Sequence, residues 1–137
     1  MDRCPCCNAR LRELSSCPRC KSDLLTIIHS EQRAKAWLSE AIQYWKKGDA
    51  KRSTWAVNTS LALKTIPLAL TFRSFIIQQE IQEVLALLEK KQPLVARQVI
   101  YNIKSLLPYS PFLQKISEFT DYLCFESSPS SLNLNNQ

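Results

Sequence analysis

Apolar residues recur along most of the chain at the three-to-four-residue spacing of an amphipathic helix. The first helix is predicted by a stripe of six residues, Ala34, Trp37, Leu38, Ala41, Tyr44 and Trp45. Leu24, Ile27 and Ile28 either extend it backwards or form a short lead-in, and in the second case Ser30 caps its start. We expect this helix to end near Gly48, after two lysines that suit the negative end of the helix dipole.

A second and a third helix follow by the same reasoning. Asp49 is a candidate N-cap for a helix over about residues 50–65, with Val57, Leu61 and Ala62 facing inward. Pro67 breaks or restarts the chain after it. A longer helix then runs to about Lys91, and its apolar stripe consists of Ile77, Ile81, Val84, Leu85 and Leu88.

Two more helices are predicted before the chain becomes polar. Pro93 opens the fourth, whose inward residues are Ala96, Val99, Ile100, Ile103 and Leu107. Residues 108–111 form a turn in which Ser110 caps the fifth helix and Pro111 takes its first position. The residues that we expect to face inward in this last helix are Phe112, Ile116, Phe119 and Leu123.

These elements predict a mainly α fold in three parts. Residues 1–24 form a small cysteine-rich module, 25–125 about five antiparallel helices with short connections, and 126–137 a polar, disordered tail. The chain of 137 residues is 45% hydrophobic, so it can bury a core, and its single glycine argues against a β-rich fold. The single glycine also excludes glycine-rich phosphate loops, and one histidine leaves little scope for imidazole chemistry.

The order of small, aromatic and proline positions in the helical part resembles tetratricopeptide-like hairpins. The positions that carry this resemblance are Ala41, Tyr44, Gly48 and Pro67 in a first unit, and Ala96, Ile100 and Pro108 in a second. Their spacing departs from the usual 34-residue period. The resemblance implies a helical-hairpin array, and the alternative is a small helical bundle of no particular family.

Five of the six cysteines lie in the first 20 residues, as Cys4-Pro5-Cys6-Cys7 and Cys17-Pro18-Arg19-Cys20. A C-x-x-C turn places two sulfurs on one side of a metal ion, so two such turns supply the four thiolates of a tetrahedral site. A module of this size cannot build a sufficient apolar core, and a bound metal replaces that core. Zinc is the predicted ion, although iron uses the same ligands.

Residues 4–25 resemble the short zinc-ribbon family, in which C-P-x-C-x-A-x-L is followed by C-P-x-C-x-x-D-L. This resemblance implies that Cys4, Cys7, Cys17 and Cys20 bind one structural Zn²⁺. The glycine that usually follows each turn is replaced by Asn8, which tolerates the left-handed conformation, and by Lys21, which fits it less well.

The remaining cysteines and charged residues have less specific interpretations. Cys6 is an incidental small residue, a free thiol beside the metal, or a replacement for Cys7 as a ligand, and Cys124 is a buried small hydrophobe. Lys46, Lys47, Lys51 and Arg52 cluster between Trp45 and Trp55, either as a patch for phosphate or an acidic partner or as a solvated loop whose tryptophans face the core. His29 is interpreted as a surface or helix-end residue, and nothing indicates an acid–base pocket around Glu80 and Glu83.

The chain carries a net charge of +6, centred on residues 26–66. No signal segment or membrane-spanning run is visible, so we expect a cytoplasmic protein that does not insert into membranes, in which thiols serve as metal ligands. The predicted function is a non-enzymatic, zinc-binding adaptor or scaffold with a protein partner, as a subunit or assembly factor of a larger complex. The alternatives are nucleic-acid binding through the zinc ribbon and the basic hairpin loop, and a redox or metal-handling role through Cys6.

Overall fold

Five α-helices and one 3-10 helix make up most of the chain in this computed structural model, which describes residues 1–12 and 14–128. In chain order they are α1 (Leu25–Lys46), α2 (Ala50–Leu63), α3 (Pro67–Glu89), α4 (Pro93–Asn102), η1 (Lys104–Tyr109) and α5 (Pro111–Glu126). The described residues contain no strand, only two isolated β-bridges. The prediction of a mainly helical chain is therefore confirmed, while most of the predicted tail lies outside the described residues.

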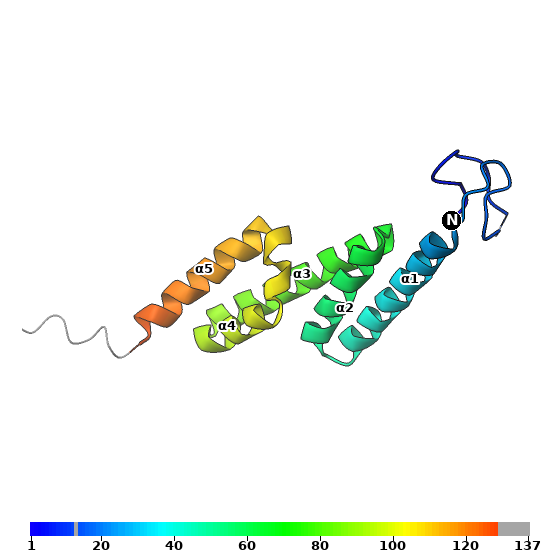
Figure 1. Ribbon diagram of the computed structural model, residues 1–137. Helices are drawn as coiled ribbons and strands as arrows, with labels where there is room; N and C mark the ends of the chain where they lie inside the picture. The colour runs from blue at the N-terminus through cyan, green and yellow to red at the C-terminus, as the bar shows by residue number, and fades with distance from the viewer. Residues whose placement is uncertain (13, 129–137) are drawn as a thin grey trace, which may run out of the picture.

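The molecule is elongated, and the helices follow one another along its length (Figure 1). The cysteine segment (residues 1–24) lies at one end, beside the start of α1, and α5 lies toward the other end. Among the described residues, no helix combines the length and the apolar character that crossing a bilayer requires.

The helix ends follow from local sequence. Helix α1 begins at Leu25, so the early apolar residues extend it backwards and Ser30 lies inside it. Gly48 reverses the chain with φ +77°, and the Asp49 side chain accepts a hydrogen bond from the Arg52 backbone N–H at 3.0 Å. The Ser110 hydroxyl accepts one from the Leu113 N–H at 3.2 Å, so both predicted N-caps are confirmed.

Two buried serines fix the packing of α2 on α1. The Ser53 hydroxyl donates to the Ala41 carbonyl at 2.8 Å, and the Ser60 hydroxyl donates to the Ala34 carbonyl at 2.7 Å. Since the higher-numbered serine meets the lower-numbered alanine, the two helices run in opposite directions. Small side chains at both contacts let the backbones approach closely, and the hydrogen bonds satisfy the buried hydroxyls.

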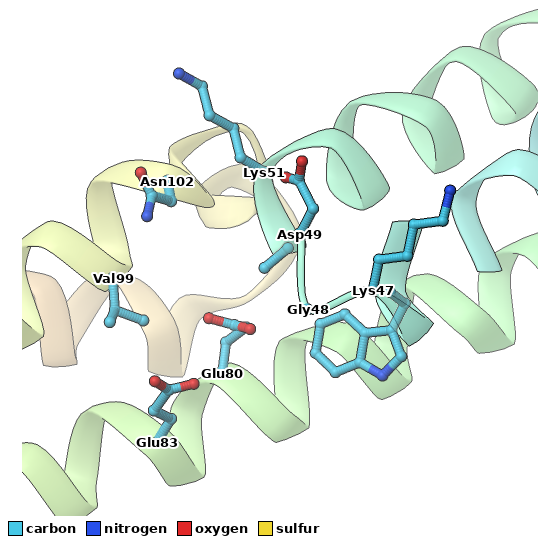
Figure 2. A pocket seen from close by; sticks show the side chains of 10 residues that line it. Lys47, Gly48, Asp49, Lys51, Glu80, Glu83, Val99 and Asn102 are labelled. Atoms are coloured by element: carbon cyan, nitrogen blue, oxygen red, sulfur yellow. The ribbon is translucent and has the colours of Figure 1, made fainter. Parts of the chain in front are cut away.

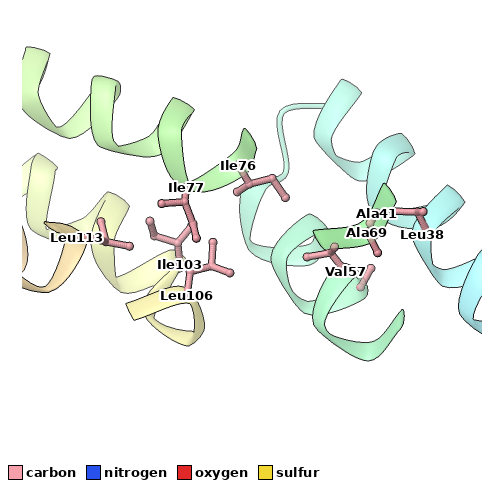
Figure 3. Packing of buried hydrophobic residues seen from close by; sticks show 10 residues of the cluster. Leu38, Ala41, Val57, Ala69, Ile76, Ile77, Ile103, Leu106 and Leu113 are labelled. Atoms are coloured by element: carbon pink, nitrogen blue, oxygen red, sulfur yellow. The ribbon is translucent and has the colours of Figure 1, made fainter. Parts of the chain in front are cut away.

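The apolar core consists of two clusters along the helices. The larger one extends from α1 and α2 across α3 to η1 and α5, and it contains Leu38, Ala41, Ala56, Val57, Ala69, Ile76, Ile77, Ile103, Leu106 and Leu113 (Figure 3). The smaller one contains Val84, Ala96, Ile100 and Ile116. Helix α3 supplies residues to both clusters and so connects the two halves of the helical region.

The structure corrects several predicted core positions. In α5, Phe112 and Phe119 are exposed, and the buried residues are Leu113, Ile116, Thr120 and Cys124. The inward face is thus rotated from the predicted one, so that Leu113 joins the larger core cluster and Ile116 the smaller one. Ala62 in α2 and Leu85 in α3 are also exposed rather than inward.

The fourth helix is shorter than predicted. It ends at Asn102, and the chain continues as the 3-10 helix η1, which contains Pro108. A proline lacks an N–H and disfavours an α conformation in the residue before it, so an α-helix cannot run unchanged to this point. The 3-10 turn still buries Leu106 and the residue just before it, Ile103.

Candidate metal centre

The two C-x-x-C turns of the cysteine segment have the same backbone structure. In the first, the Asn8 N–H donates to the Cys4 carbonyl at 2.9 Å, and the Cys4 N–H donates to the Ala9 carbonyl at 2.9 Å. Asn8 has φ +57°, so it takes the left-handed conformation that the sequence assigned to this position.

The second turn repeats these contacts thirteen residues later. The Lys21 N–H donates to the Cys17 carbonyl at 2.9 Å, and the Cys17 N–H donates to the Ser22 carbonyl at 3.0 Å. Lys21 has φ +59°, so it adopts the left-handed conformation despite its side chain. The bridges Arg3–Arg10 and Ser16–Asp23 flank the two turns at equivalent places. The cysteine segment is therefore built from two like halves, each of which presents two sulfurs.

The two halves bring the sulfurs of Cys4, Cys7, Cys17 and Cys20 into one group. The Sγ atoms of Cys4 and Cys20 lie 3.6 Å apart, those of Cys7 and Cys17 lie 3.5 Å apart, and all four lie within 4.8 Å of one another. A disulfide needs about 2.05 Å, so these cysteines are free thiols. A tetrahedron with Zn–S bonds of about 2.3 Å has edges of about 3.8 Å, and the observed spacing fits such an ion.

Local contacts make the four thiols electrostatically unequal. Burial raises the pKa of Cys4 to about 12. The Ser22 hydroxyl lies 2.9 Å from the Cys20 sulfur, and the hydrogen bonds from Ser22 lower the pKa of Cys20 to about 6. The backbone N–H of Cys20 lowers the pKa of Cys17. Hydrogen-bond donors thus favour thiolates in the second half, and a cation would displace the protons that remain.

A small apolar cluster attaches the cysteine segment to the first helix. Cys4, Cys17 and Leu24 are buried together, and Ile28 of α1 packs against them. The Asp23 carboxylate also accepts a hydrogen bond from the Leu25 N–H at 2.9 Å, at the first residue of α1. Apolar packing and a hydrogen bond thus both join the cysteine segment to the start of α1.

The other cysteines and the histidine lie outside the sulfur group. Cys6 is exposed between two of the clustered cysteines in the sequence, and it does not belong to the group that can hold an ion. Cys124 is buried on α5, as predicted, and His29 is exposed on α1.

In the predicted basic cluster at the α1–α2 connection, Arg52 already contacts other side chains of the protein. The Arg52 guanidinium lies 3.5 Å from the Asp49 carboxylate and faces the Tyr44 ring at 5.9 Å from its centroid. Trp55 is 57% exposed, and its ring centroid lies 4.9 Å from that of Trp37 in an edge-to-face contact. The alternative of a solvated loop whose two tryptophans face the core therefore does not hold for Trp55.

The structure contains a second candidate site, a cavity that the sequence did not predict. This cavity of about 590 Å³ lies between the α1–α2 loop, α3 and α4, and its lining includes Trp45, Glu80 and Glu83 (Figure 2). Glu80 is only 5% exposed, and burial raises its pKa to about 7, with a smaller contribution from Glu83. One signal was available: Glu80 lies at helical spacing from Ile76 and Val84, within the buried stripe of α3.

Comparison of the chain with models of protein families, with curated proteins and with solved structures finds no match in any of the three. Function is therefore inferred from the structure, which shows four cysteines within metal-binding distance and a helical region attached to them.

Proposed function

We propose that this protein is a non-enzymatic adaptor that binds one structural Zn²⁺ and holds a protein partner on its helical surface, as a subunit or assembly factor of a larger complex. The cysteine segment serves as a zinc ribbon and the helices as a tetratricopeptide-like array. A site of four thiolates has no open position for water or substrate, so the ion would cross-link the segment. A cytoplasmic, reducing setting suits these thiols.

The observation that carries the proposal is a contiguous aromatic surface on the helices. Trp45 of α1 contacts Phe75 of α3 edge to face, with 5.7 Å between the ring centroids, and Phe75 stacks on Phe72 with 6.1 Å between the centroids. Phe75 is 40% exposed, and the other two rings are half-buried. We call Trp45, Phe72 and Phe75 the aromatic cluster. Trp45 and Phe72 also pack against the core, so they hold the exposed Phe75 ring in place. Exposed aromatic rings that are fixed by their neighbours are typical of protein–protein binding surfaces, because burying them on binding releases water from apolar area.

The experiment combines metal and partner analysis of the full chain. The purified protein is analysed for zinc and iron, and partners that co-purify are identified by mass spectrometry and then rebound as pure proteins by calorimetry. We expect one zinc per chain and a partner whose affinity falls at least tenfold with Phe75→Ala. The matched control is Phe125→Ala, which removes an aromatic ring that is 75% exposed at the far end of α5.

Two results would contradict this function. If no purified partner binds the wild-type chain, the adaptor role is wrong. If Phe75→Ala and Phe125→Ala weaken binding equally, the aromatic cluster is not the contact surface.

Nucleic-acid binding is the second candidate, and the arginines of the cysteine segment favour it. Arg3, Arg10 and Arg12 line a hollow of about 510 Å³, together with Asp2 and Leu11. Three guanidinium groups around one hollow suit phosphate oxygens. This candidate predicts an affinity for DNA or RNA that falls steeply with salt and weakens when Arg10 and Arg12 are replaced by glutamine. Absence of retained nucleic acid at about 50 mM salt would remove it.

A further inference from the structure

The cavity beside the α1–α2 loop contains a carboxylate that nothing in the described part of the chain neutralises. Glu80 is 95% buried, since only 5% of its surface is exposed, and it lines the cavity. None of the residues that the structure describes forms a hydrogen bond or an ion pair with Glu80, and its carboxylate oxygens are not fully enclosed, so they are open to the cavity. A buried, unpartnered carboxylate is costly in a folded protein, so a group that pairs with it from outside is expected to bind well.

The nearby cations of the chain do not fill this role. Lys47 and Lys51 line the cavity, but Figure 2 shows their ammonium ends directed away from Glu80. Arg52 is engaged with Asp49, which caps α2. The acidic side chains directed into the cavity are thus Glu80 and Glu83, and Figure 2 shows both of them rising from α3 toward α4 and the loop.

The shape and chemistry of the cavity fit a planar cation better than a metal ion. The two glutamates lie three residues apart on α3, so they project from the same side of the helix. Trp45 supplies an aromatic wall, and Asn102 supplies an amide on the α4 side. Over the described residues, the one group of ligand atoms close enough to hold a metal is the four-cysteine group, so Glu80, Glu83 and Asp49 do not form a compact metal site.

We propose that this cavity binds the guanidinium group of an arginine side chain presented by the protein partner. A guanidinium forms paired hydrogen bonds to carboxylates and stacks on an aromatic ring, and the cavity offers both kinds of contact. Trp45 belongs both to the cavity wall and to the aromatic cluster. When the partner's arginine enters the cavity, apolar residues next to it in the partner would therefore contact the aromatic cluster. The chain carries a net charge of +6, which disfavours general attraction of cations and makes this recognition local.

This inference rests on the proposed adaptor function, because it names the partner side chain that the adaptor would hold. The test is calorimetric titration of the full chain with a nine-residue peptide whose central arginine lies between two aromatic residues. A second peptide carries citrulline, which has the shape of arginine but no charge. We expect the arginine peptide to bind at least tenfold more tightly than the citrulline peptide.

Variants assign this preference to the cavity. Glu80→Gln keeps the shape of the side chain and removes its charge, and we expect it to reduce the arginine preference at least fivefold. Glu83→Gln is a second variant with a smaller expected effect, and circular dichroism verifies that both fold. The matched control is Glu118→Gln, an exposed acid on α5 that should leave the preference unchanged.

Three results would overturn the inference. Equal affinity for the arginine and citrulline peptides would do so, and so would an unchanged preference in Glu80→Gln. If the arginine peptide binds more tightly than the citrulline peptide only in the Lys51→Ala variant, the ammonium group of Lys51 occupies the cavity in the wild type.

A further titration, with acetylated arginine amide, separates the two sources of a guanidinium. We expect it to bind much more weakly than the peptide, and equal affinity would overturn the assignment to a protein partner. If purified partners bind while arginine and citrulline peptides do not differ, this inference fails and the adaptor function stands. If the arginine preference holds but no protein partner is found, the adaptor function fails instead.

Discussion

Replacing Glu80 with glutamine should stabilise the protein, and by an amount that depends on pH. Glu80 is buried in α3 with Glu83 beside it, and both burial and this second carboxylate favour its protonated form. Its pKa is raised from the ordinary value of 4.5 to about 7. Glutamine has nearly the same volume and no charge, so it removes the electrostatic cost and leaves the packing of α3 intact.

The sign and size of the effect follow from these pKa values. Below about pH 4.5 the residue is protonated in both the folded and the unfolded chain, and its titration has no effect on stability. Between about pH 4.5 and 7 the unfolded chain releases the proton more readily, so wild-type stability falls as the pH rises. At about 1.4 kcal/mol per pH unit, this interval corresponds to about 3 kcal/mol, and the loss stays constant above pH 7.

Urea unfolding of the wild type and Glu80→Gln from pH 4 to pH 8 measures this difference. We expect the two free energies of unfolding to be similar near pH 4 and to diverge by about 3 kcal/mol near pH 8. The control is Glu89→Gln, which changes an exposed glutamate on the same helix and should run parallel to the wild type. If the Glu80→Gln profile is also parallel to the wild type, Glu80 is not held in its uncharged form and the reasoning is wrong.

Three other predictions concern the cysteine segment and the helix ends. Cys17→Ser should prevent metal binding, so that the backbone amides of the cysteine segment exchange with solvent while those of α3 to α5 remain protected. Elemental analysis and hydrogen exchange measure these two effects, and an ion retained by the variant would count against the site. Asp49→Ala removes the N-cap of α2 and should lower the free energy of unfolding by about 1 kcal/mol in urea, whereas no loss would mean that the cap contributes nothing. Lys91 follows α3 with φ +57°, a left-handed conformation that strains any residue with a Cβ atom. Lys91→Gly should therefore raise the free energy of unfolding by roughly 1 kcal/mol, and a lower melting temperature in the variant would contradict this strain.

Local signals in the sequence were sufficient for most helix ends and for the grouping of the cysteines. The caps at Asp49 and Ser110 depend on residues within one turn, so tertiary structure hardly alters them. The two C-x-x-C turns also form locally, and the spacing between them is short enough to bring their sulfurs together. The domain boundaries and the bound ion stay predictions.

What the sequence could not supply depends on contacts between distant helices. In α5, one helical stripe contains Phe112 and Phe119, and another contains Leu113 and Thr120. Periodicity alone cannot choose between overlapping stripes, and hydrophobicity favours the phenylalanines, which the structure leaves in solvent. The Glu80 cavity has a similar origin, because it requires α3 and α4 to meet the α1–α2 loop, and no local motif encodes that meeting.

Helix α3 runs through both apolar clusters, and this continuity has a mechanical consequence. Its 23 residues form a rod about 34 Å long, since each residue adds 1.5 Å, and it is anchored to different neighbours at each end. One continuous helix thus serves both clusters, so the two halves of the helical region share a structural element rather than a linker. A break in the middle of α3 would therefore disturb the packing of both halves at once.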